Sequence, residues 1–288
     1  MSEQPKAGVL GDPVAHSRSP LIHNFWLSEY GLQGSYEKLH ITADAFTPYV
    51  RALASRGYVG ANVTLPHKEA AFALADELDP WAARLKAVNT LVFEGGRIKG
   101  FNTDGYGFMQ NLASEAPQWH RDRPVLVLGA GGAARAIVAS LAVAGVPEIY
   151  MANRTVEKIE SFRPLVADTD CRLRALSWPE RQIPLAEIGL LVNTTSLGMA
   201  EKDMTENDKT LDIALDDMAS DAVVTDIVYT PLITPLLRAA RAHELHIVDG
   251  LGMLLHQAAP GFAHWFGRQP QVTTALRQHI EADLQGGA

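Results

Sequence analysis

The sequence predicts an α/β protein of two domains. Short apolar runs of strand length alternate with longer helical patterns along most of the chain, which is typical of parallel sheets covered by helices. The 288 residues correspond to about two domains at roughly 150 residues each. The alternation also begins afresh after Pro124, with a fully apolar strand that runs directly into a glycine-rich turn.

In the first half, helix and turn signals separate the strand-like runs. A helix that Ser19 can cap, with Pro20 in its first turn, is expected to end near Gly31. The residues Glu94-Gly95-Gly96-Arg97, which lie between apolar runs, predict a hairpin turn. Strands are expected at residues 7–10, 36–40, 61–64 and 88–93.

In the second half, a helical pattern rich in Ala, Val and Leu follows the first strand and extends to Gly145. The acidic stretch 201–208 is predicted to be a surface loop. Helical patterns at 253–266 and 271–284 have no strands of their own to cover. Strands are expected at residues 125–128, 148–152, 190–194, 223–227 and 246–248.

The composition excludes several classes of protein. Lys and Arg number 25 against 33 Asp and Glu, a net charge of −8 with no basic block, so we expect no nucleic-acid partner. The single cysteine, Cys171, suits a reducing compartment. No apolar leader opens the sequence, and the apolar stretch 125–146 is interrupted by Arg135 and several glycines, so neither a signal peptide nor a membrane span is expected. We therefore predict a cytoplasmic protein.

The ten histidines do not form a recognisable metal motif, because neither His-Glu-x-x-His nor a cysteine pair occurs. No metal is expected.

A dinucleotide-binding motif begins the second half. Gly129-x-Gly131-x-x-Ala134 lies where a strand turns into a helix, which is the context that makes such a motif informative. Gly129 permits the tight turn, Gly131 lets the backbone approach a pyrophosphate, and Ala134 keeps helix and strand close. The helix N-terminus would offer unpaired N–H groups to the phosphates.

The choice of cofactor should be visible at the end of the following strand, where NAD-binding proteins place an acidic residue against the ribose. Here the sequence reads Asn153-Arg154-Thr155. An arginine can pair with a 2′-phosphate, while the neighbouring Asn and Thr add neutral hydrogen bonds. The sequence therefore favours NADP. The alternative is that Arg154 is only a solvated arginine at the start of a helix and binds no phosphate.

The first half contains three clusters of small hydrogen-bonding groups, at residues 16–20, 62–68 and 89 with 102–104. Asn62 and Thr64 should point to the same face, because side chains alternate along a strand. Such clusters suit a small polyhydroxylated ligand, each hydroxyl of which meets a donor or an acceptor.

Lys68 and Asp104 are the charges in these clusters that could act as an acid/base pair. Oxidation of an alcohol to a ketone requires a group that takes the hydroxyl proton, and a lysine beside a carboxylate can do so. Taken singly, Lys68 could equally be a solvated lysine, and Ser19 and Asp104 could be helix caps.

Taken together, the motifs resemble those of the shikimate dehydrogenase family in order and spacing, from about Gly8 to Gly267. The matching motifs are His16-Ser17-Arg18-Ser19-Pro20, Asn62-Val63-Thr64-x-Pro66-x-Lys68, Ala87-Val88-Asn89-Thr90, Asn102-Thr103-Asp104-Gly105, Gly129-Ala130-Gly131-Gly132-Ala133, Asn153-Arg154-Thr155, Asn193-Thr194-Thr195-Ser196-x-Gly198 and Asp249-Gly250-x-Gly252-Met253-x-x-x-Gln257-Ala258.

The resemblance implies reversible, NADP-dependent reduction of 3-dehydroshikimate to shikimate, on the pathway to chorismate and the aromatic amino acids. It implies that Lys68 is the general acid/base and that Asp104 orients it. It also implies a substrate domain of residues 1–104 completed by helices from 250–288, and a Rossmann-type NADP domain of residues 105–249.

Further site residues are implied by position in the motifs. The expected substrate contacts are Ser17, Ser19, Asn62, Thr64, Asn89, Tyr229 and Gln257. The expected cofactor contacts are Gly129, Ala130, Gly131, Gly132, Ala133, Asn153, Arg154, Thr155, Thr195, Ser196, Gly250 and Met253.

Two other functions are compatible with these residues. A relative that oxidises quinate, or both acids, with NAD would tend to carry threonine at Ser19 and an acidic residue near Arg154. A regulator that binds NADP without turnover would have no need to keep both Lys68 and Asp104. The sequence favours neither of them, and a monomer and a homodimer both remain open.

Overall fold

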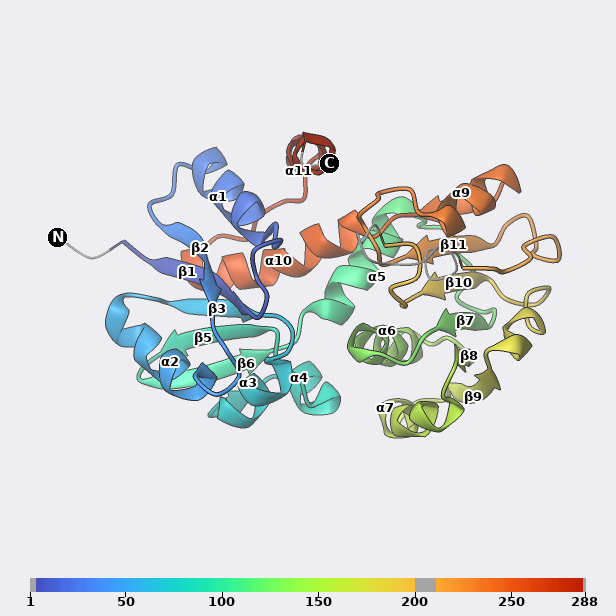
Figure 1. Ribbon diagram of the computed structural model, residues 1–288, viewed down its shortest axis with the longest axis horizontal. Helices are drawn as coiled ribbons and strands as arrows, with labels where there is room; N and C mark the ends of the chain where they lie inside the picture. The colour runs from blue at the N-terminus through green and yellow to red at the C-terminus, as the bar shows by residue number, and fades with distance from the viewer. Residues whose placement is uncertain (1–3, 200–210, 287–288) are drawn as a thin grey trace. The chain divides into compact units, whose positions relative to one another are not determined.

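The computed structural model describes residues 4–199 and 211–286 and divides into two compact units (Figure 1). Unit 1 comprises Met1–Asp104 with Leu255–Ala288, and unit 2 comprises Gly105–Leu254. The chain passes from one unit to the other inside helices α5 (Asp104–Glu115) and α10 (Leu251–Phe266). The second boundary therefore falls inside α10, later than the expected residue 250.

The sheet of unit 1 is mixed. Strand β1 pairs in parallel with β2 and β3, whereas β5 pairs antiparallel with both β3 and β6. Among the described strands of this sheet only β5 runs against its neighbours, and the hairpin expected at residues 94–97 reverses the chain between β5 and β6. In spatial order the described strands are β2 (Ser35–His40), β1 (Lys6–Gly11), β3 (Gly60–Val63), β5 (Thr90–Glu94), β6 (Arg97–Phe101) and β4 (Glu77–Leu78).

The hairpin predicted at residues 94–97 is confirmed. Gly95 and Gly96 have φ angles of 59° and 76°, and Glu94 pairs directly with Arg97. Two consecutive residues with positive φ form the tight turn whose twist matches that of the strands, and glycine adopts this conformation at low cost.

Helix α1 (Ser19–Glu29) begins differently from the prediction. Arg18 occupies the N-cap position without a side-chain cap, and Ser19 is already helical, so the prediction that Ser19 caps this helix is wrong. The Ser17 hydroxyl instead accepts a hydrogen bond from the Ser19 backbone N–H at 3.3 Å. The Ser19 hydroxyl is thereby left available to other groups.

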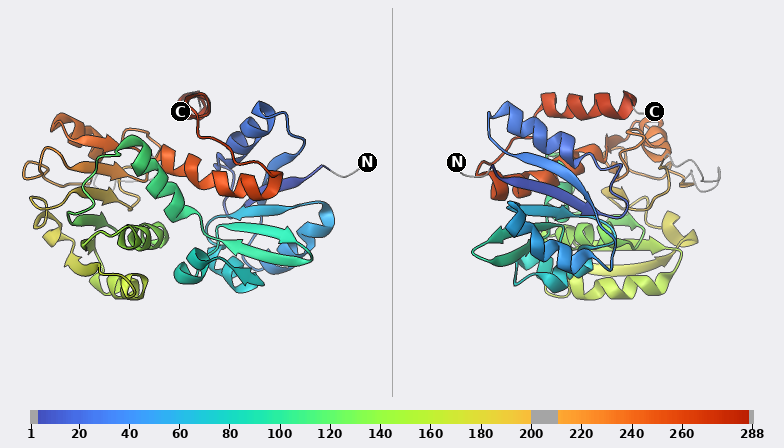
Figure 2. Two further views of the ribbon diagram at one scale, coloured as in Figure 1. Left: turned by 180° about the vertical axis from the view of Figure 1, so that it is seen from behind. Right: turned by 60° about the vertical axis from the view of Figure 1, so that its left-hand side comes forward.

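Side-chain alternation divides the core of unit 1 between the two faces of its sheet. Leu10 packs with residues of α2 (Phe46–Leu53), α3 (Lys68–Leu74) and α4 (Pro80–Leu85) on one face. Ala7 and Val9 pack with Trp265 of α10 on the other. Figure 2 shows these helices from two further directions.

Helix α10 packs closely against the sheet of unit 1. A Cβ atom at Gly60 would lie 2.0 Å from Trp265 Nε1 and 2.2 Å from the Leu91 carbonyl oxygen. Trp265 Nε1 donates a hydrogen bond to that carbonyl at 2.9 Å. Helix α11 (Thr274–Gly286) packs against α1, where Arg18 forms an ion pair with Asp283 at 3.0 Å. The last helices of the chain thus complete unit 1.

The sheet of unit 2 is wholly parallel and doubly wound. In spatial order its described strands are β12 (His246–Val248), β11 (Val223–Asp226), β10 (Leu190–Asn193), β7 (Val125–Leu128), β8 (Glu148–Asn153) and β9 (Arg172–Ser177). The order reverses between β7 and β10, and ligands of such sheets bind beyond the carboxyl ends of the strands at that point. The turn after β7 carries the glycine motif.

Helices cover this second sheet, and most of its strands were predicted. Helix α6 (Gly132–Val143) has a largely buried Ala/Ile/Val/Leu face and packs with α7 (Arg163–Val166). Helix α9 (Pro235–Ala242) contributes Leu236, Leu237 and Ala240 to the core. Sequence reasoning missed β9, although the Arg-Leu-Arg-Ala alternation at its start is a signal of a half-exposed edge strand. The acidic stretch 201–208 lies outside the described residues.

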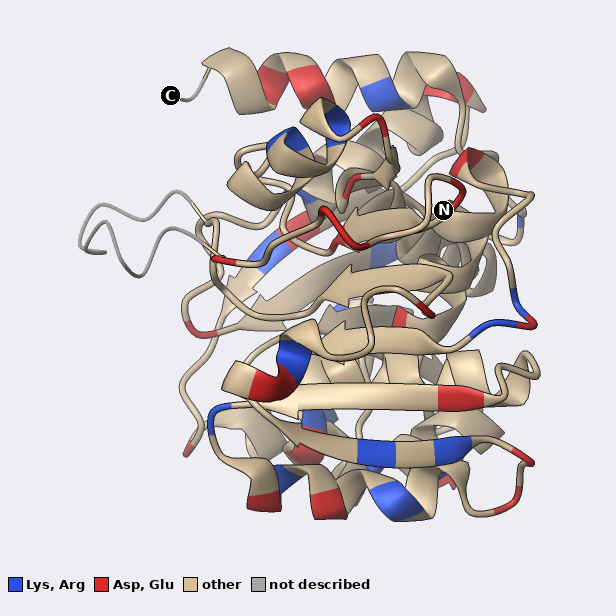
Figure 3. Cartoon of the chain, turned by 90° about the vertical axis from the view of Figure 1, so that its right-hand side faces the viewer, with Lys and Arg blue, Asp and Glu red and all other residues tan. Residues whose placement is uncertain are grey.

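Charged side chains are distributed over both units. Figure 3 shows Lys and Arg segments interspersed with Asp and Glu segments. An exposed ion pair such as Arg97–Glu77, at 2.6 Å, contributes little to stability because water and salt screen it. None of the helices within residues 4–199 and 211–286 combines the length and apolar character that crossing a bilayer requires.

His23 is a buried imidazole inside an aromatic cluster of unit 1. Its ring stacks on Tyr36 at 4.1 Å, and Trp26 and Trp265 lie at 5.7 and 5.4 Å. Burial lowers the pKa of His23 to about 3, partly opposed by the side chain of Asn62. The folded state therefore holds a neutral His23 over almost the whole acidic range.

This burial predicts a loss of stability in acid. Below about pH 6.5 the unfolded chain protonates His23, whereas the folded chain does so only near pH 3. Stability should therefore fall by up to roughly 1.4 kcal/mol per pH unit in this window through His23 alone. Denaturant unfolding of the protein and of His23→Phe at pH 7, 6, 5 and 4 should show a shallower decline in the variant. Parallel profiles would contradict the prediction.

Candidate functional site

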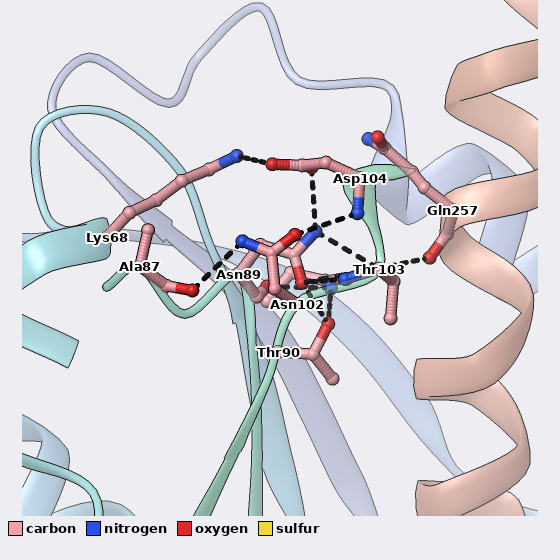
Figure 4. A network of polar contacts seen from close by, with 9 residues as sticks. Lys68, Ala87, Asn89, Thr90, Asn102, Thr103, Asp104 and Gln257 are labelled. Atoms are coloured by element: carbon pink, nitrogen blue, oxygen red, sulfur yellow. Dashed lines mark hydrogen bonds and ion pairs between the residues drawn. The ribbon is translucent and has the colours of Figure 1, made fainter. Parts of the chain in front are cut away.

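Lys68 and Asp104 form an ion pair in unit 1, where helices α3 and α5 begin. Lys68 opens α3 and Asp104 opens α5, and Lys68 Nζ donates to Asp104 Oδ2 at 2.5 Å (Figure 4). The Lys68 side chain is 28% exposed and that of Asp104 is 8% exposed. The lysine can therefore reach a ligand while the carboxylate stays nearly dry.

The Asp104 carboxylate is fixed by more than the lysine. Asn89 Nδ2 donates to Asp104 Oδ1 at 2.8 Å, and the Asp104 backbone N–H donates to Asn102 Oδ1 at 3.1 Å. The Asn102 amide is itself anchored on the Ala87 carbonyl at 2.9 Å. A negative charge at the start of α5 is also favoured by the helix dipole.

Asn89 occupies the centre of this cluster. Its Oδ1 accepts hydrogen bonds from the Thr103 backbone N–H at 3.0 Å and from the Thr90 hydroxyl at 2.9 Å. The Thr103 hydroxyl donates to the backbone carbonyl of Gln257 on α10 at 2.8 Å. Figure 4 shows the Gln257 side chain directed to the side of the cluster on which Asp104 lies.

Asn62 extends the network along β3. Its Nδ2 donates to the Asn89 carbonyl and to the Thr90 hydroxyl, both at 3.1 Å, and its Oδ1 accepts from the Tyr36 hydroxyl at 2.7 Å. Burial raises the pKa of the Tyr36 hydroxyl well above its usual value, so this group stays a donor. Sequence reasoning missed Tyr36. The signal for it was a tyrosine on the inward face of a strand, which needs a partner for its hydroxyl.

The serines of the first motif lie at the other end of this chain of polar groups. The Ser17 hydroxyl donates to the Ser19 hydroxyl at 3.2 Å, and Ser19 also hydrogen bonds to Tyr36. Both serines are half-buried, as is Thr64, which follows β3. Asn62 and Thr64 are both more exposed than the buried Val63 between them, as alternation on one face requires.

The structure thus links most of the expected substrate and catalytic residues of unit 1 by hydrogen bonds into one network. The linked residues are Ser17, Ser19, Asn62, Asn89, Lys68, Asp104 and, through its backbone, Gln257. Tyr229 follows β11 in unit 2, and its contact with substrate stays a prediction.

Unit 2 contains a cavity of about 550 Å³ at the carboxyl ends of its strands. Its walls come from the turns after β7, β8 and β10 and from the segment after β9. The lining residues are Gly129, Ala130, Gly131, Asn153, Arg154, Lys158, Trp178, Arg181, Thr194, Thr195, Ser196, Leu197 and Asp212.

The glycine turn of this cavity fits a pyrophosphate. Gly129 has a φ of 99°, and a Cβ there would lie 2.9 Å from both Thr194 Oγ1 and Thr195 Cγ2. At Gly131 and Gly132, by contrast, a Cβ would meet nothing within 4 Å. The backbone is thus bare and open where α6 begins, and its unpaired N–H groups favour phosphate oxygens.

Three cations line the same cavity. Arg154 and Lys158 are exposed after β8, and the half-buried Arg181 stacks its guanidinium on Trp178 at 4.8 Å. Such a set suits an additional phosphate on the ribose. Sequence reasoning found Arg154 but missed Lys158 and Arg181. Arg181 could not be found, because only the fold brings its distant segment to the end of β8.

The remaining expected cofactor residues lie outside the cavity walls. Gly250 is buried, and a Cβ there would lie 2.4 Å from the Ile227 carbonyl oxygen. Met253 is also buried. Gly132, Ala133, Thr155, Gly250 and Met253 are absent from the residues lining this cavity, and their contacts with cofactor stay predictions. Across residues 4–199 and 211–286, no three His, Cys, Asp or Glu side chains gather as they do around a metal ion.

A doubly wound sheet with an open glycine turn and three cations at its edge defines a dinucleotide-binding unit, and the Lys68–Asp104 pair of unit 1 is of the kind that can carry acid/base chemistry. Together they define the class of pyridine-nucleotide-dependent dehydrogenases. Family comparison is more specific. Residues 9–91 match the shikimate dehydrogenase substrate binding domain, 111–252 match shikimate / quinate 5-dehydrogenase, and 250–278 match the shikimate 5′-dehydrogenase C-terminal domain. The chain belongs to the shikimate dehydrogenase family.

Individual relatives agree with this assignment. A shikimate dehydrogenase (NADP(+)) of Brucella abortus is 49% identical, with 99% of this chain and 96% of the relative covered. The crystal structure of shikimate 5-dehydrogenase from Thermus thermophilus in complex with NADP(H) and shikimate has a TM-score of 0.80 at 34% identity, covering 98% of this chain and 99% of that one. Quinate dehydrogenase from Corynebacterium glutamicum in complex with NAD has a TM-score of 0.87 at 26% identity, covering 97% and 99%.

The open glycine turn predicts the effect of one added methyl group. Gly131 has an extended backbone with φ −92°, and its Cβ would touch nothing in the chain, so Gly131→Ala should fold normally. The methyl group would occupy the space expected for the pyrophosphate. We expect NADP affinity to fall by roughly 5- to 150-fold, because overpacked contacts cost about 1–3 kcal/mol. Fluorescence titration with NADP and a thermal melt would check both parts, and unchanged affinity would contradict the assignment of the turn.

Proposed function

We propose that the protein catalyses the NADP-dependent, reversible reduction of 3-dehydroshikimate to shikimate. The observation that carries this is the 2.5 Å Lys68–Asp104 pair, set in a network of amides and hydroxyls in a chain of the shikimate dehydrogenase family. The reaction serves the synthesis of chorismate and the aromatic amino acids.

The donors and acceptors of unit 1 suit a small ring bearing hydroxyls and one carboxylate. Ser17, Ser19 and Thr64 offer hydroxyls, and Asn62, Asn89 and Gln257 offer amides. Many of these groups are already held by neighbours, as Asn62 is by Tyr36 and Thr90. A prearranged set binds substrate with a smaller loss of side-chain entropy than a mobile one.

Lys68 performs the proton step. Its Nζ–H donates to the keto oxygen as that oxygen gains negative charge, and it takes the hydroxyl proton back in the reverse direction. Asp104 accepts one hydrogen bond from Lys68 and another from Asn89, so it keeps the ammonium group in place and does not need to move. NADPH, when bound, supplies the hydride, and NADP⁺ accepts it in the reverse direction.

Arg154 and Lys158 favour the 2′-phosphate of NADP over the bare ribose of NAD. Neither side chain is an acceptor, so neither can take the place of the acidic residue that holds the ribose hydroxyls in NAD-binding proteins. A cytoplasmic location and a monomeric or homodimeric state are part of the same proposal.

The test is an assay of initial rates on shikimate and on quinate, each with NADP and with NAD. We expect shikimate with NADP to dominate. A preference for quinate or NAD would place the protein with the quinate dehydrogenases, and NADP binding without turnover on either acid would indicate a regulator. Serine at position 19, where quinate-oxidising relatives tend to carry threonine, differs from it by one methyl group, which shifts the preference between two substrates by only about 1–3 kcal/mol. A slow rate on quinate is therefore compatible with the proposal.

Lys68→Ala removes the proton donor and leaves the rest of the polar network. Turnover should fall at least ~100-fold, the usual scale for a lost general acid or base, while shikimate affinity changes little. Steady-state kinetics and a shikimate titration would measure both quantities. Near-normal turnover would show that another group moves the proton.

Arg154→Ala removes a charge from the proposed 2′-phosphate site. The affinity for NADP should fall by more than that for NAD, because only NADP loses a charge-assisted contact. Titrations of both cofactors would give the ratio, with Arg172→Ala on the exposed β9 as a control that should not alter it. Equal losses for the two cofactors would show that Arg154 does not contact the phosphate.

A further inference from the structure

Asp226 is a buried carboxyl group of unit 2 to which neither the motifs nor the proposed chemistry assigns a role. It ends β11 and is fully buried, as is Asn193 at the end of the neighbouring β10. Thr234, the N-cap of α9, is also fully buried. These three polar side chains have no exposure, so they must satisfy one another. Asn193 ends a strand that borders the cavity, whereas Asp226 ends the next strand and Thr234 begins a helix.

The hydrogen bonds of Asp226 reach three separate segments. Oδ1 accepts from Asn193 Nδ2 at 3.0 Å and from the Val228 backbone N–H at 3.0 Å. Oδ2 accepts from the Thr234 hydroxyl at 2.8 Å. Burial raises the pKa of Asp226 to about 6, so at neutral pH the group is ionised and both oxygens accept.

Asn193 connects Asp226 to the cavity wall by hydrogen bonds. Its Oδ1 accepts from the Thr195 backbone N–H at 3.0 Å and from the Thr195 hydroxyl at 2.7 Å, and its Nδ2 also donates to the Leu197 carbonyl at 3.2 Å. Thr195 and Leu197 both line the cavity. The Thr195 N–H can only donate, so the amide oxygen must face it and the amide nitrogen must face an acceptor. Asp226 is the side-chain acceptor and the Leu197 carbonyl is the second one.

We infer that Asp226 is a positioning residue for the cofactor: through the Asn193 amide it holds residues 194–198 in the conformation that receives NADP. This rests on the proposed function. The same carboxylate holds Val228 and hence the turn after β11, against whose Ile227 carbonyl Gly250 is packed. One buried anion therefore fixes two neighbouring loops at the carboxyl edge of the sheet, and the loop after β10 is the one beside the switch point.

Asparagine at position 226 can replace the carboxylate. Its oxygen can accept from Asn193 and Val228, and its NH₂ can donate to the Thr234 hydroxyl, which accepts as well as donates. Leucine is of similar size but offers no acceptor, so one N–H of the buried Asn193 amide would lose its partner and the amide would be held only by Thr195 and Leu197. The two variants separate hydrogen bonding from packing.

The experiment measures NADP dissociation constants, without substrate, for the unaltered protein, Asp226→Asn, Asp226→Leu, Asn193→Leu and the double variant Asp226→Leu/Asn193→Leu. We expect Asp226→Asn to stay within ~3-fold of the unaltered protein and Asp226→Leu to bind at least ~10-fold more weakly, the range for losing a buried hydrogen-bond partner. If Asp226 acts through Asn193, the double variant should bind no more weakly than Asn193→Leu.

Thr234→Val is the matched control. It removes the contact of Asp226 with α9 and leaves the contact with Asn193, so it should lower the melting temperature and leave NADP affinity within ~3-fold. If Asp226→Leu does not fold, Asp226→Ser replaces it, because a serine hydroxyl remains near Val228 but is too short to reach Asn193.

Unchanged NADP affinity in the folded Leu or Ser variant, or additive losses in the double variant, would overturn the inference and leave the proposed function intact. A loss in Thr234→Val as large as in Asp226→Leu would also overturn it, because general loosening would then explain both. Failure of the unaltered protein to bind NADP would overturn the proposed function and this inference together.

Discussion

The nearly buried carboxylate of Asp104 determines which polar groups must surround it in unit 1. An anion in that position is costly unless every oxygen is met by a donor. Asp104 meets the requirement with Lys68 and Asn89 and with its place at the start of α5. Asn89 must then be held in turn by Thr103 and Thr90, and the chain of dependence continues to Asn62 and Tyr36. The polar network thus extends outward from one buried charge, and each member holds the next.

In unit 2, buried polar groups at the ends of parallel strands are likewise matched with hydrogen-bond partners. The carboxyl ends of β7, β8, β10 and β11 bring a bare glycine turn, the Arg154 cation and the Asn193–Asp226 pair to one edge of one sheet. None of these segments is adjacent in sequence. The doubly wound topology brings them together, and buried hydrogen bonds then fix how each loop leaves its strand.

What could be predicted depended on whether the signal was local. The Gly95-Gly96 hairpin and the glycine turn after β7 follow from backbone conformations that only glycine adopts cheaply, so the sequence alone was enough. Lys68 and Asp104 could be paired because motif and chemistry agreed. Tyr36 and Arg181 were missed because their roles exist only after distant segments meet. The cap assigned to Ser19 failed because the helix begins one residue earlier: Arg18 is the N-cap, and its backbone carbonyl accepts from the N–H groups of Leu21 and Ile22. Propensity does not decide between two neighbouring starts.

Because α10 and α11 return to unit 1, the unit is discontinuous in sequence, whereas unit 2 is one uninterrupted stretch. On a ribosome, Gly105–Leu254 is complete while the strands of unit 1 still lack Trp265 and the helix that covers them. During that interval the apolar face formed by Val9 of β1, Tyr36 of β2 and Val92 of β5 has no native cover. The order of synthesis therefore makes the nucleotide unit the first to be able to fold, and the substrate unit depends on the last part of the chain to be made.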